Sequence, residues 1–358
     1  MEKDFSILPT HLDGDQDMDL YGRDLITTQD WSIDELVATM KLAGKLKEMR
    51  KKGKLPPKVL DRKNFFMVFW APSTRTRGAF EAGMNLLGGH APYIDVMTTR
   101  IGTGEALRDV IQMYDIYGDG IGVRALDEAI DFVYGNGRRI VEEFAKIAKV
   151  PVINMACCTY HPTQAIGDIM TLRNKIGRLR GKKYTITWAC SSKLRGRGSI
   201  QEELLIATRF GMDVVLAYPP GFDIDPNIVE AARRNARDAG GSLEMSHNFK
   251  QTLNGANVVF PRSWVTSELS RVGATAFGTD NEITIHDKYR NWKLEKSHVD
   301  DLMGKSAVVT HVLPAYRGEE VTDEVIDGPN SVIHEQAEDN FYAKMAVLSL
   351  TMSVKAMP

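Results

Sequence analysis

The sequence predicts an α/β protein built from two doubly wound parallel-sheet domains. From Lys183 onward, short apolar runs alternate with helical patterns, which is typical of a parallel sheet with helical crossovers. Earlier in the chain, the apolar run 65–69 leads through a turn into another helical pattern. A chain of 358 residues, 43% of them hydrophobic, is also long enough to bury two cores.

The elements of the first half follow from capping signals and apolar runs. Ser32 and Glu35 form a capping box that begins a helix ending near residue 49. Buried strands are predicted at 65–69, at 119–123, where the strand ends at Arg124, and at 150–155.

The second half is predicted to alternate more regularly. The expected elements are strands at 184–189, 213–217 and 306–310, short strands near Leu243 and Val258, and helices at 200–210, 226–239 and 335–356. The halves are expected to meet near 155–165, giving domains at 1–158 and 159–334.

Composition excludes several classes of protein. A net charge of −2 offers no basic field for nucleic acid. No run approaches 18 apolar residues, and the start Met1-Glu2-Lys3-Asp4 lacks an apolar signal core, so the sequence predicts a cytoplasmic protein without membrane contact. The cysteines Cys157, Cys158 and Cys190 have neither disulfide nor zinc spacing, and we expect buried thiols.

The segment that follows the run 65–69 predicts an anion site. Pro72 breaks the strand, and the cluster 73–77 (Ser-Thr-Arg-Thr-Arg) opens a helix. A helix N-terminus presents unpaired N–H groups and the positive end of its dipole. With hydroxyls and a guanidinium at the same place, it suits a dianionic phosphate. On this segment alone, a capped helix with solvated arginines is the alternative.

Two further segments place polar residues where open parallel sheets bind ligands. Tyr160-His161-Pro162-Thr163-Gln164 begins one helical pattern, and Thr310-His311-Val312-Leu313-Pro314 ends a strand. With 73–77, in this order and at these separations, the chain resembles the aspartate/ornithine carbamoyltransferase family over nearly its whole length. The stretch 311–331 resembles ornithine carbamoyltransferases in particular.

The resemblance implies a carbamoyl phosphate-binding domain at 1–158, an amine-acceptor-binding domain at 159–334, and a C-terminal helix at 335–356 that packs back on the first. It implies no metal and no organic cofactor. The residues that it assigns to carbamoyl phosphate are Ser73, Thr74, Arg75, Thr76, Arg124, His161, Gln164 and Leu313, the last through its main-chain carbonyl. Four of them are expected to be catalytic: Arg75, Arg124, His161 and Gln164.

The segment Pro261-Arg262-Ser263-Trp264 resembles a branch of the family, the acetylornithine and succinylornithine carbamoyltransferases and their uncharacterised relatives. That branch has a trefoil-knotted backbone, so we expect a knot around the loop 191–199 and the segment after Trp264. The acceptor-binding residues implied are Arg262, Ser263, Trp264, Leu313 and Glu320. Glu320 is expected to face the acceptor as a carboxylate.

Several positions depart from the family pattern. Glu320 takes the place of a modified lysine, Val312 that of a cysteine, and Asn340 that of an arginine. Two hypotheses therefore stand. The first is a carbamoyltransferase whose acceptor is amino-acid-like but neither plain ornithine nor aspartate. The second is a binding or regulatory protein of the same fold with reduced catalysis.

Gly102 and Gly104 suggest a dinucleotide loop, but the third glycine and a preceding strand are missing. In the resembling family, this loop reaches the neighbouring subunit's site. The sequence therefore predicts a cyclic homotrimer in which Arg100 serves the neighbour. An exposed loop arginine is the alternative.

Overall fold

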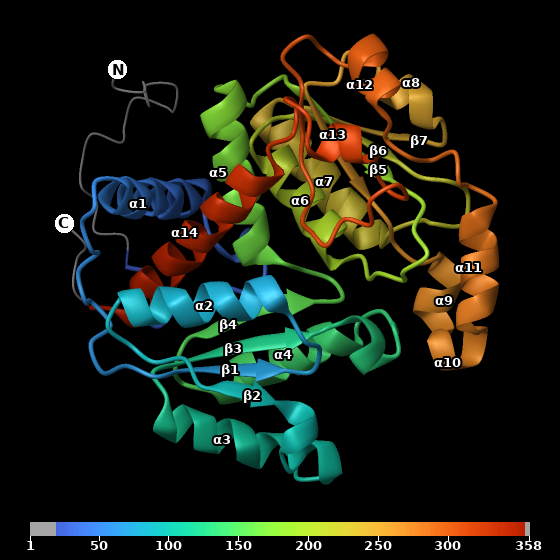
Figure 1. Cartoon of the computed structure of the whole chain (residues 1–358). Helices are drawn as coiled ribbons and strands as arrows, with labels where there is room; N and C mark the ends of the chain where they lie inside the picture. The colour runs from blue at the N-terminus through green and yellow to red at the C-terminus, as the bar shows by residue number, and fades with distance from the viewer. Residues whose placement is uncertain (1–18, 355–358) are drawn as a thin grey trace.

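The computed structural model of the chain, shown in Figure 1, describes residues 19–354. The first sheet is parallel, with strand order β2-β1-β3-β4, and the second is parallel, with order β7-β6-β5-β8-β9. The first sheet consists of β1 (Phe65–Phe69), β2 (Tyr93–Asp95), β3 (Gly120–Ala125) and β4 (Val152–Cys157). The second consists of β5 (Lys183–Trp188), β6 (Asp213–Ala217), β7 (Ser242–Ser246), β8 (Val258–Arg262) and β9 (Val308–Val309). The predicted pair of parallel-sheet α/β domains is confirmed.

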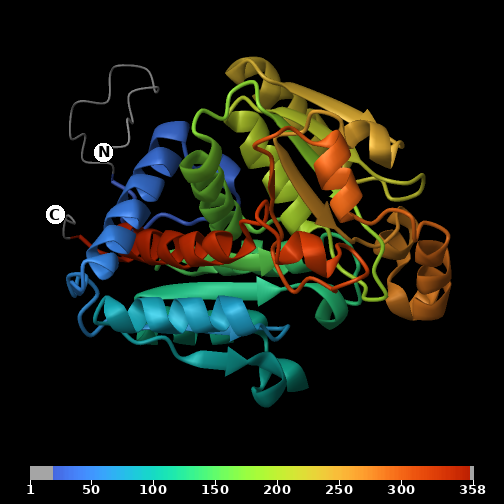
Figure 2. The ribbon, with the colours of Figure 1, turned by 45° about the horizontal axis from the view of Figure 1, so that its top comes forward.

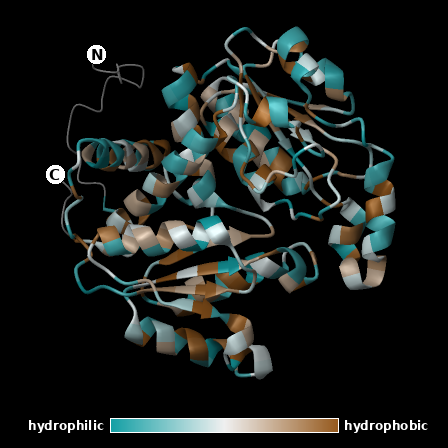
Figure 3. Cartoon of the chain, viewed as in Figure 1, coloured by the Kyte–Doolittle hydropathy of each residue, from teal (hydrophilic) through white to brown (hydrophobic). Residues whose placement is uncertain are grey.

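Both faces of the first sheet are buried. Because successive residues of a strand point to opposite faces of the sheet, one strand contributes side chains to two cores. Phe65, Met67 and Phe69 of β1 belong to the larger core, whereas Val68 packs in a second core with Phe144. Hydrophobic residues accordingly gather on the strands in Figure 3. The helices before β5 are α1 (Ile33–Lys51), α2 (Thr74–Leu86), α3 (Leu107–Tyr117), α4 (Asn136–Ile147) and α5 (Pro162–Ile176), with short 3-10 turns η1 (Thr28–Asp30), η2 (Val96–Thr98), η3 (Ile101–Thr103) and η4 (Asp127–Ile130).

The second half contains more helices than the sequence predicts. The predicted α6 (Gly198–Arg209) and α7 (Pro226–Ala239) are present, whereas the predicted strand at 306–310 shortens to β9. The short helices were not predicted: α8 (Phe249–Leu253), α9 (Ser267–Val272), α10 (Ala274–Phe277), α11 (Thr279–Asp287), α12 (Lys296–Leu302) and α13 (Asp323–Ile326).

The closing helix α14 (Ile333–Met352) runs back from the second domain and packs against α1, α2 and α5, as Figure 2 shows. The ammonium of Lys47 on α1 lies 2.6 Å from Oδ1 of Asp339. Gly83 of α2 permits the close approach, since a Cβ there would lie 3.0 Å from Cγ of Met345. Residues 355 and 356 of the predicted helix lie outside the described residues, as does the predicted start at Met1.

Two sequence predictions, the trefoil knot and the cytoplasmic location, are not decided by this architecture. The strand order does not test the trefoil knot, which stays a prediction. Within residues 19–354, no helix combines the length and the apolar character that a membrane span requires. The cytoplasmic location stays a prediction as well. In the same part of the chain, no three His, Cys, Asp or Glu side chains gather as metal ligands would.

Candidate active site

Residues from both sheets line one cavity of about 220 Å³. The strands contribute at or just beyond their carboxyl ends, which is where open parallel sheets place ligands. The first sheet supplies Ser73 after β1, Arg124 from β3 and His161 after β4, while the second supplies Arg262 from β8 and His311 after β9.

The N-terminus of α2 forms one wall of the cavity. The Ser73 hydroxyl caps the helix by accepting the N–H of Thr76 at 3.2 Å. The Arg124 guanidinium is held against this turn, because its Nε donates to the Ala71 carbonyl at 3.2 Å and its Nη1 lies 3.5 Å from the Thr76 hydroxyl. Arg75, in the first turn of α2, also lines the cavity. Hydroxyls, free helix N–H groups and guanidinium groups thus converge, as an oxyanion requires.

Five cations line the cavity: Arg75, Arg124, Arg195, Arg262 and Lys344. Partial burial lowers the pKa of Arg75, and the neighbouring charges of Arg262 and Arg195 lower it further. Burial lowers the pKa of Arg124 to about 10, with repulsion from Arg75 and Arg195 adding to the shift. Because these cations repel one another, an anion in the cavity would be strongly stabilised.

Two neutral groups face the same space. His161 precedes α5 as its N-cap, and its Nδ1 is buried without a hydrogen-bond partner in the described chain. Burial and the charge of Arg124 hold the pKa of His161 well below its usual range, so the imidazole is neutral at pH 7. The amide of Gln164 is oriented at both ends, since its Nε2 donates to Asp168 Oδ2 at 3.1 Å and its Oε1 accepts from Ser199 Oγ at 3.2 Å. Both groups suit hydrogen bonds to an uncharged carbonyl or amide.

The loop after β9 closes the cavity from the second domain. The His311 ring accepts the Leu313 N–H on Nδ1 at 2.9 Å, and the His311 backbone N–H donates to Gln336 Oε1 at 3.0 Å. Leu313 has a left-handed φ of 49°, a conformation that costs a leucine about 1 to 3 kcal/mol. Nη1 of Arg262 lies 3.4 Å from the Pro314 carbonyl oxygen. The loop is therefore fixed to both β8 and α14.

Comparison with known proteins agrees with this geometry. Residues 23–174 match the model for the aspartate/ornithine carbamoyltransferase carbamoyl-P binding domain, and residues 182–351 match that for its Asp/Orn binding domain. The chain belongs to the aspartate/ornithine carbamoyltransferase family. It is a carbamoyltransferase. The domain boundary predicted at 158 stays a prediction.

Individual relatives are similar over almost their whole length. An ornithine carbamoyltransferase of Thermococcus kodakarensis is 36% identical, with 93% of this chain and 97% of the relative covered. An N-acetylornithine carbamoyltransferase of Xylella fastidiosa is 34% identical, with 92% and 98% covered. A variant N-acetyl-L-ornithine transcarbamylase, solved with carbamyl phosphate and N-succinyl-L-norvaline, superposes with a TM-score of 0.81 at 31% identity, covering 91% of this chain and 99% of that one.

The structure brings most of the predicted carbamoyltransferase site together. The predicted residues that line the cavity are Ser73, Arg75, Thr76, Arg124, His161, Gln164, Arg262 and Leu313. Thr74 is exposed at the start of α2 and does not line the cavity. Arg100 lies between η2 and η3, and it does not line the cavity of its own chain either. The part that Arg100 would play in a neighbour's site stays a prediction.

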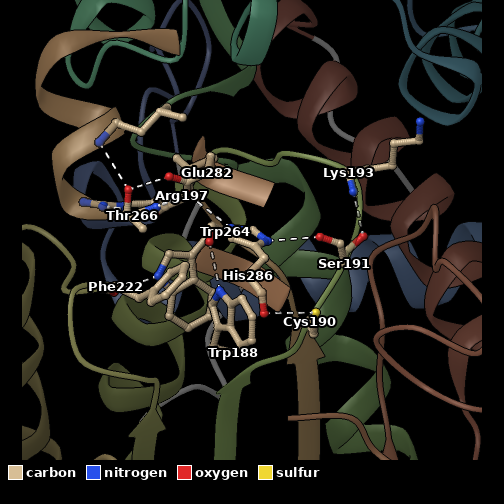
Figure 4. A network of polar contacts seen from close by, with 12 residues as sticks. Trp188, Cys190, Ser191, Lys193, Arg197, Phe222, Trp264, Thr266, Glu282 and His286 are labelled. Carbon is tan, nitrogen blue, oxygen red and sulfur yellow. Dashed lines mark hydrogen bonds and ion pairs between the residues drawn. The ribbon is translucent and has the colours of Figure 1, made fainter. Parts of the chain in front are cut away.

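Trp264 does not line the cavity, contrary to the expectation that it faces the acceptor. Its side chain is fully buried, and its indole N–H donates to the Phe222 carbonyl at 2.8 Å. The indole of Trp188 in turn donates to the Trp264 carbonyl at 2.9 Å. Figure 4 shows these rings beside the pair formed by His286 and Glu282. The structure therefore places Trp264 in the core of the second domain.

Ser263 and Glu320 are also buried and lie behind the cavity wall. The Glu320 carboxylate accepts the N–H of Ser263 at 2.8 Å and that of Tyr316 at 3.2 Å, and lies 3.3 Å from Nε2 of His311. Burial opposes its ionisation, but His311, Arg262 and the Ser263 N–H together lower the pKa of Glu320 to about 2. Glu320 thus holds the wall of the site as an ionised group instead of facing the acceptor.

Sequence reasoning missed Arg195 and Lys344. Nη2 of Arg195 donates to the Tyr316 hydroxyl at 2.7 Å, and Gly196 N–H donates to Asp127 Oδ1 at 2.8 Å, which fixes the loop that carries Arg195. The basic run around Arg195 and the lysine in the otherwise apolar final turns of α14 were the available signals.

Proposed function

We propose that this protein transfers the carbamoyl group between carbamoyl phosphate and the amine of an amino-acid-like acceptor that bears a carboxylate and is neither plain ornithine nor aspartate. The observation that carries the proposal is that Arg75, at the phosphate-type helix N-terminus, and Arg262, from the second domain, line the same cavity. The cavity can therefore bind two anionic groups near the neutral pair His161 and Gln164.

In the proposal, carbamoyl phosphate occupies the half of the cavity beside α2. The phosphate binds the first-turn N–H groups of α2 and the side chains of Ser73, Arg75 and Thr76. Arg124 and His161 lie beside the carbonyl oxygen. Gln164 and the main-chain carbonyl of Leu313 orient the carbamoyl NH₂. A solved relative that contains carbamyl phosphate supports this compound as the ligand.

Carbamoyl transfer requires hydrogen-bond donors that stabilise the carbonyl oxygen, whereas the attacking nucleophile is the acceptor amine and does not come from the protein. The lone pair of the acceptor amine forms a C–N bond to the carbonyl carbon, and negative charge builds on the carbonyl oxygen near Arg124 and His161. The bond from carbon to the phosphate oxygen breaks as the charge collapses. Phosphate leaves with the bonding electrons, and the proton that the amine gives up ends on the departing phosphate as HPO₄²⁻. The reverse direction is phosphorolysis of a ureido compound.

The acceptor occupies the half of the cavity beside Arg262 and Arg195. A guanidinium binds a carboxylate in a planar, two-point geometry. The resemblance of 261–264 to the acetylornithine branch, and the N-acetylornithine enzymes among the relatives, favour an N-acylated ornithine ahead of short diamino acids such as diaminopropionate. Ornithine is the second candidate, since the relative at 36% identity carries that name.

The deciding experiment is phosphate release from carbamoyl phosphate with a panel of acceptors: N-acetylornithine, N-succinylornithine, diaminopropionate, ornithine, aspartate and putrescine. We expect the fastest turnover with an acylated ornithine. Turnover with ornithine alone would contradict the acceptor assignment. Binding of carbamoyl phosphate without turnover of any acceptor would favour the regulatory alternative.

Replacing Arg262 by methionine should raise the acceptor KM or abolish turnover, because we place Arg262 on the acceptor half. Carbamoyl phosphate binding should stay within about 1 kcal/mol of wild type, about a fivefold change in affinity. Initial rates and calorimetric titration measure the two effects. Arg271→Met is the matched control, since Arg271 pairs with Glu268 on the surface of α9. Loss of carbamoyl phosphate binding with intact acceptor affinity would assign Arg262 to the other half of the site.

We also propose a cyclic homotrimer in which Arg100 reaches the neighbouring site. Met113, Ile116 and Tyr117 are exposed on one face of α3, as their spacing requires, and Met97 is 75% exposed in the loop that leads to Arg100. Covering these apolar side chains with a second copy of the chain would remove them from water.

Sedimentation should therefore show a trimer, and Ile116→Lys should yield a less active monomer. Leu55→Lys, at another exposed apolar residue, is the control and should stay trimeric. A fully active wild-type monomer would overturn the proposal.

A further inference from the structure

Lys344 is a buried cation in the wall of the cavity. Lys344 is only 5% exposed. It lies about two turns before the end of α14, and its side chain reaches the cavity. The ammonium donates to the Asn340 carbonyl oxygen at 3.2 Å and to Asn340 Oδ1 at 3.3 Å. An ammonium has three N–H donors, so one remains available. No carboxylate among residues 19–354 pairs with Lys344 within 4.0 Å.

Asp168 holds the Asn340 amide in place but does not form an ion pair with the Lys344 ammonium. Its Oδ1 accepts from Asn340 Nδ2 at 2.6 Å, so the other end of the Asn340 amide, Oδ1, is left to face Lys344. Its Oδ2 accepts from Gln164. Both carboxylate oxygens are thus engaged by amides. A buried ammonium that only neutral oxygens contact is costly, unless an anion joins it in the complex.

The surroundings of Lys344 show which half of the cavity it serves. The titratable and charged groups that face it are Asp168 from α5, His161 at the start of α5, Arg124 from β3 and Arg75 from α2. The last three are the groups that we place around carbamoyl phosphate. Burial lowers the pKa of Lys344 to about 8, with Asp168 opposing the shift and Arg124 and Arg75 adding to it.

We propose that Lys344 is a carbamoyl phosphate-binding residue, which donates its free N–H to an anionic oxygen of that substrate from the C-terminal helix. The inference rests on the proposed function and adds a residue that the sequence did not assign. It also gives Asp168 a role as a positioning residue, because one carboxylate orients the amides of both Gln164 and Asn340.

The test is calorimetric titration of carbamoyl phosphate into the full chain at pH 7. Lys344→Met should weaken binding about 10- to 100-fold, as the loss of one charged hydrogen bond does. Lys344→Arg should bind within about threefold of wild type, since it keeps the charge. Lys175→Met is the matched control, because Lys175 makes an exposed ion pair with Glu335 on the same pair of helices and should change nothing.

The pH dependence separates a binding role from a structural one. Wild-type affinity should fall as the pH rises from 7 to 9, because the free ammonium loses its proton near pH 8. Lys344→Arg should show no such fall, because a guanidinium stays charged over this range. Equal affinity of wild type and Lys344→Met, or the same pH profile in the arginine variant, would overturn the inference. If the wild type itself bound no carbamoyl phosphate, the proposed function would fail first.

Discussion

Replacing Arg75 by alanine should lower kcat/KM for carbamoyl phosphate by a factor of about 100 or more, on the order of 3 kcal/mol of transition-state stabilisation. Arg75 lies in the first turn of α2, where we place the phosphate group, whose charge increases as it leaves. Within the described chain its guanidinium makes no ion pair, so the fold should be unaffected. Steady-state kinetics and a thermal melt measure the two effects.

The chain provides a control two residues away. Arg77 shares the first turns of α2, but its Nε pairs with Glu81 at 2.8 Å, its guanidinium lies 3.9 Å from the centroid of the Tyr93 ring, and it does not line the cavity. Arg77→Ala should therefore keep nearly full activity. Equal rates for Arg75→Ala and wild type would remove α2 from the proposed phosphate site.

Replacing Glu320 by alanine should destabilise the fold by about 3 to 5 kcal/mol, the usual cost of removing one member of a buried charged group. The N–H groups of Ser263 and Tyr316 would lose their acceptor, and His311 Nε2 would lose the carboxylate oxygen that lies 3.3 Å away. Arg262 would keep its charge without the carboxylate that balances it most strongly. Denaturant unfolding measures the loss, and Glu324→Ala on the exposed side of α13 is the control.

The same substitution predicts a pH effect. Glu320 has a pKa of about 2 in the folded protein, below its ordinary 4.5. The stabilisation that it provides is therefore complete above pH 4.5 and disappears as the pH falls toward 2. The difference in unfolding free energy between wild type and Glu320→Ala should shrink over this interval. A constant difference would show that the carboxylate is not ionised in the fold.

The fold could be predicted most closely where local signals mark both ends of an element. The predicted bounds of α7 match the structure because Asp225 caps it, Pro226 occupies its first position, and Gly240 ends it with a φ of 70°. The short helices α9 to α11 lack a sustained apolar period and depend on packing against the rest of the second domain. Sequence reasoning therefore missed them.

The site residues, too, could be predicted where the signal is local and were missed where their position depends on distant contacts. Ser73 and Thr76 could be predicted because a helix N-terminus is defined by adjacent residues. Trp264 was expected at the cavity because the segment 261–264 resembles the acetylornithine branch, but the direction of its side chain depends on Phe222, some 40 residues away. Lys344 was missed although it is a lysine among apolar residues, because α14 is buried on nearly every side and its hydropathy pattern does not show which face meets the cavity.

The return of α14 to the first domain has a consequence for how the protein is made. The sheet β1–β4 and its helices α1, α2 and α5 leave the ribosome well before residues 333–352 are synthesised. Until then the apolar surfaces that α14 covers are open to water, and the cavity lacks Asn340 and Lys344. Nascent chains of this kind are prone to aggregation. We therefore expect chaperone dependence to concentrate in the interval before α14 emerges, and the site to be complete only when the last helix docks.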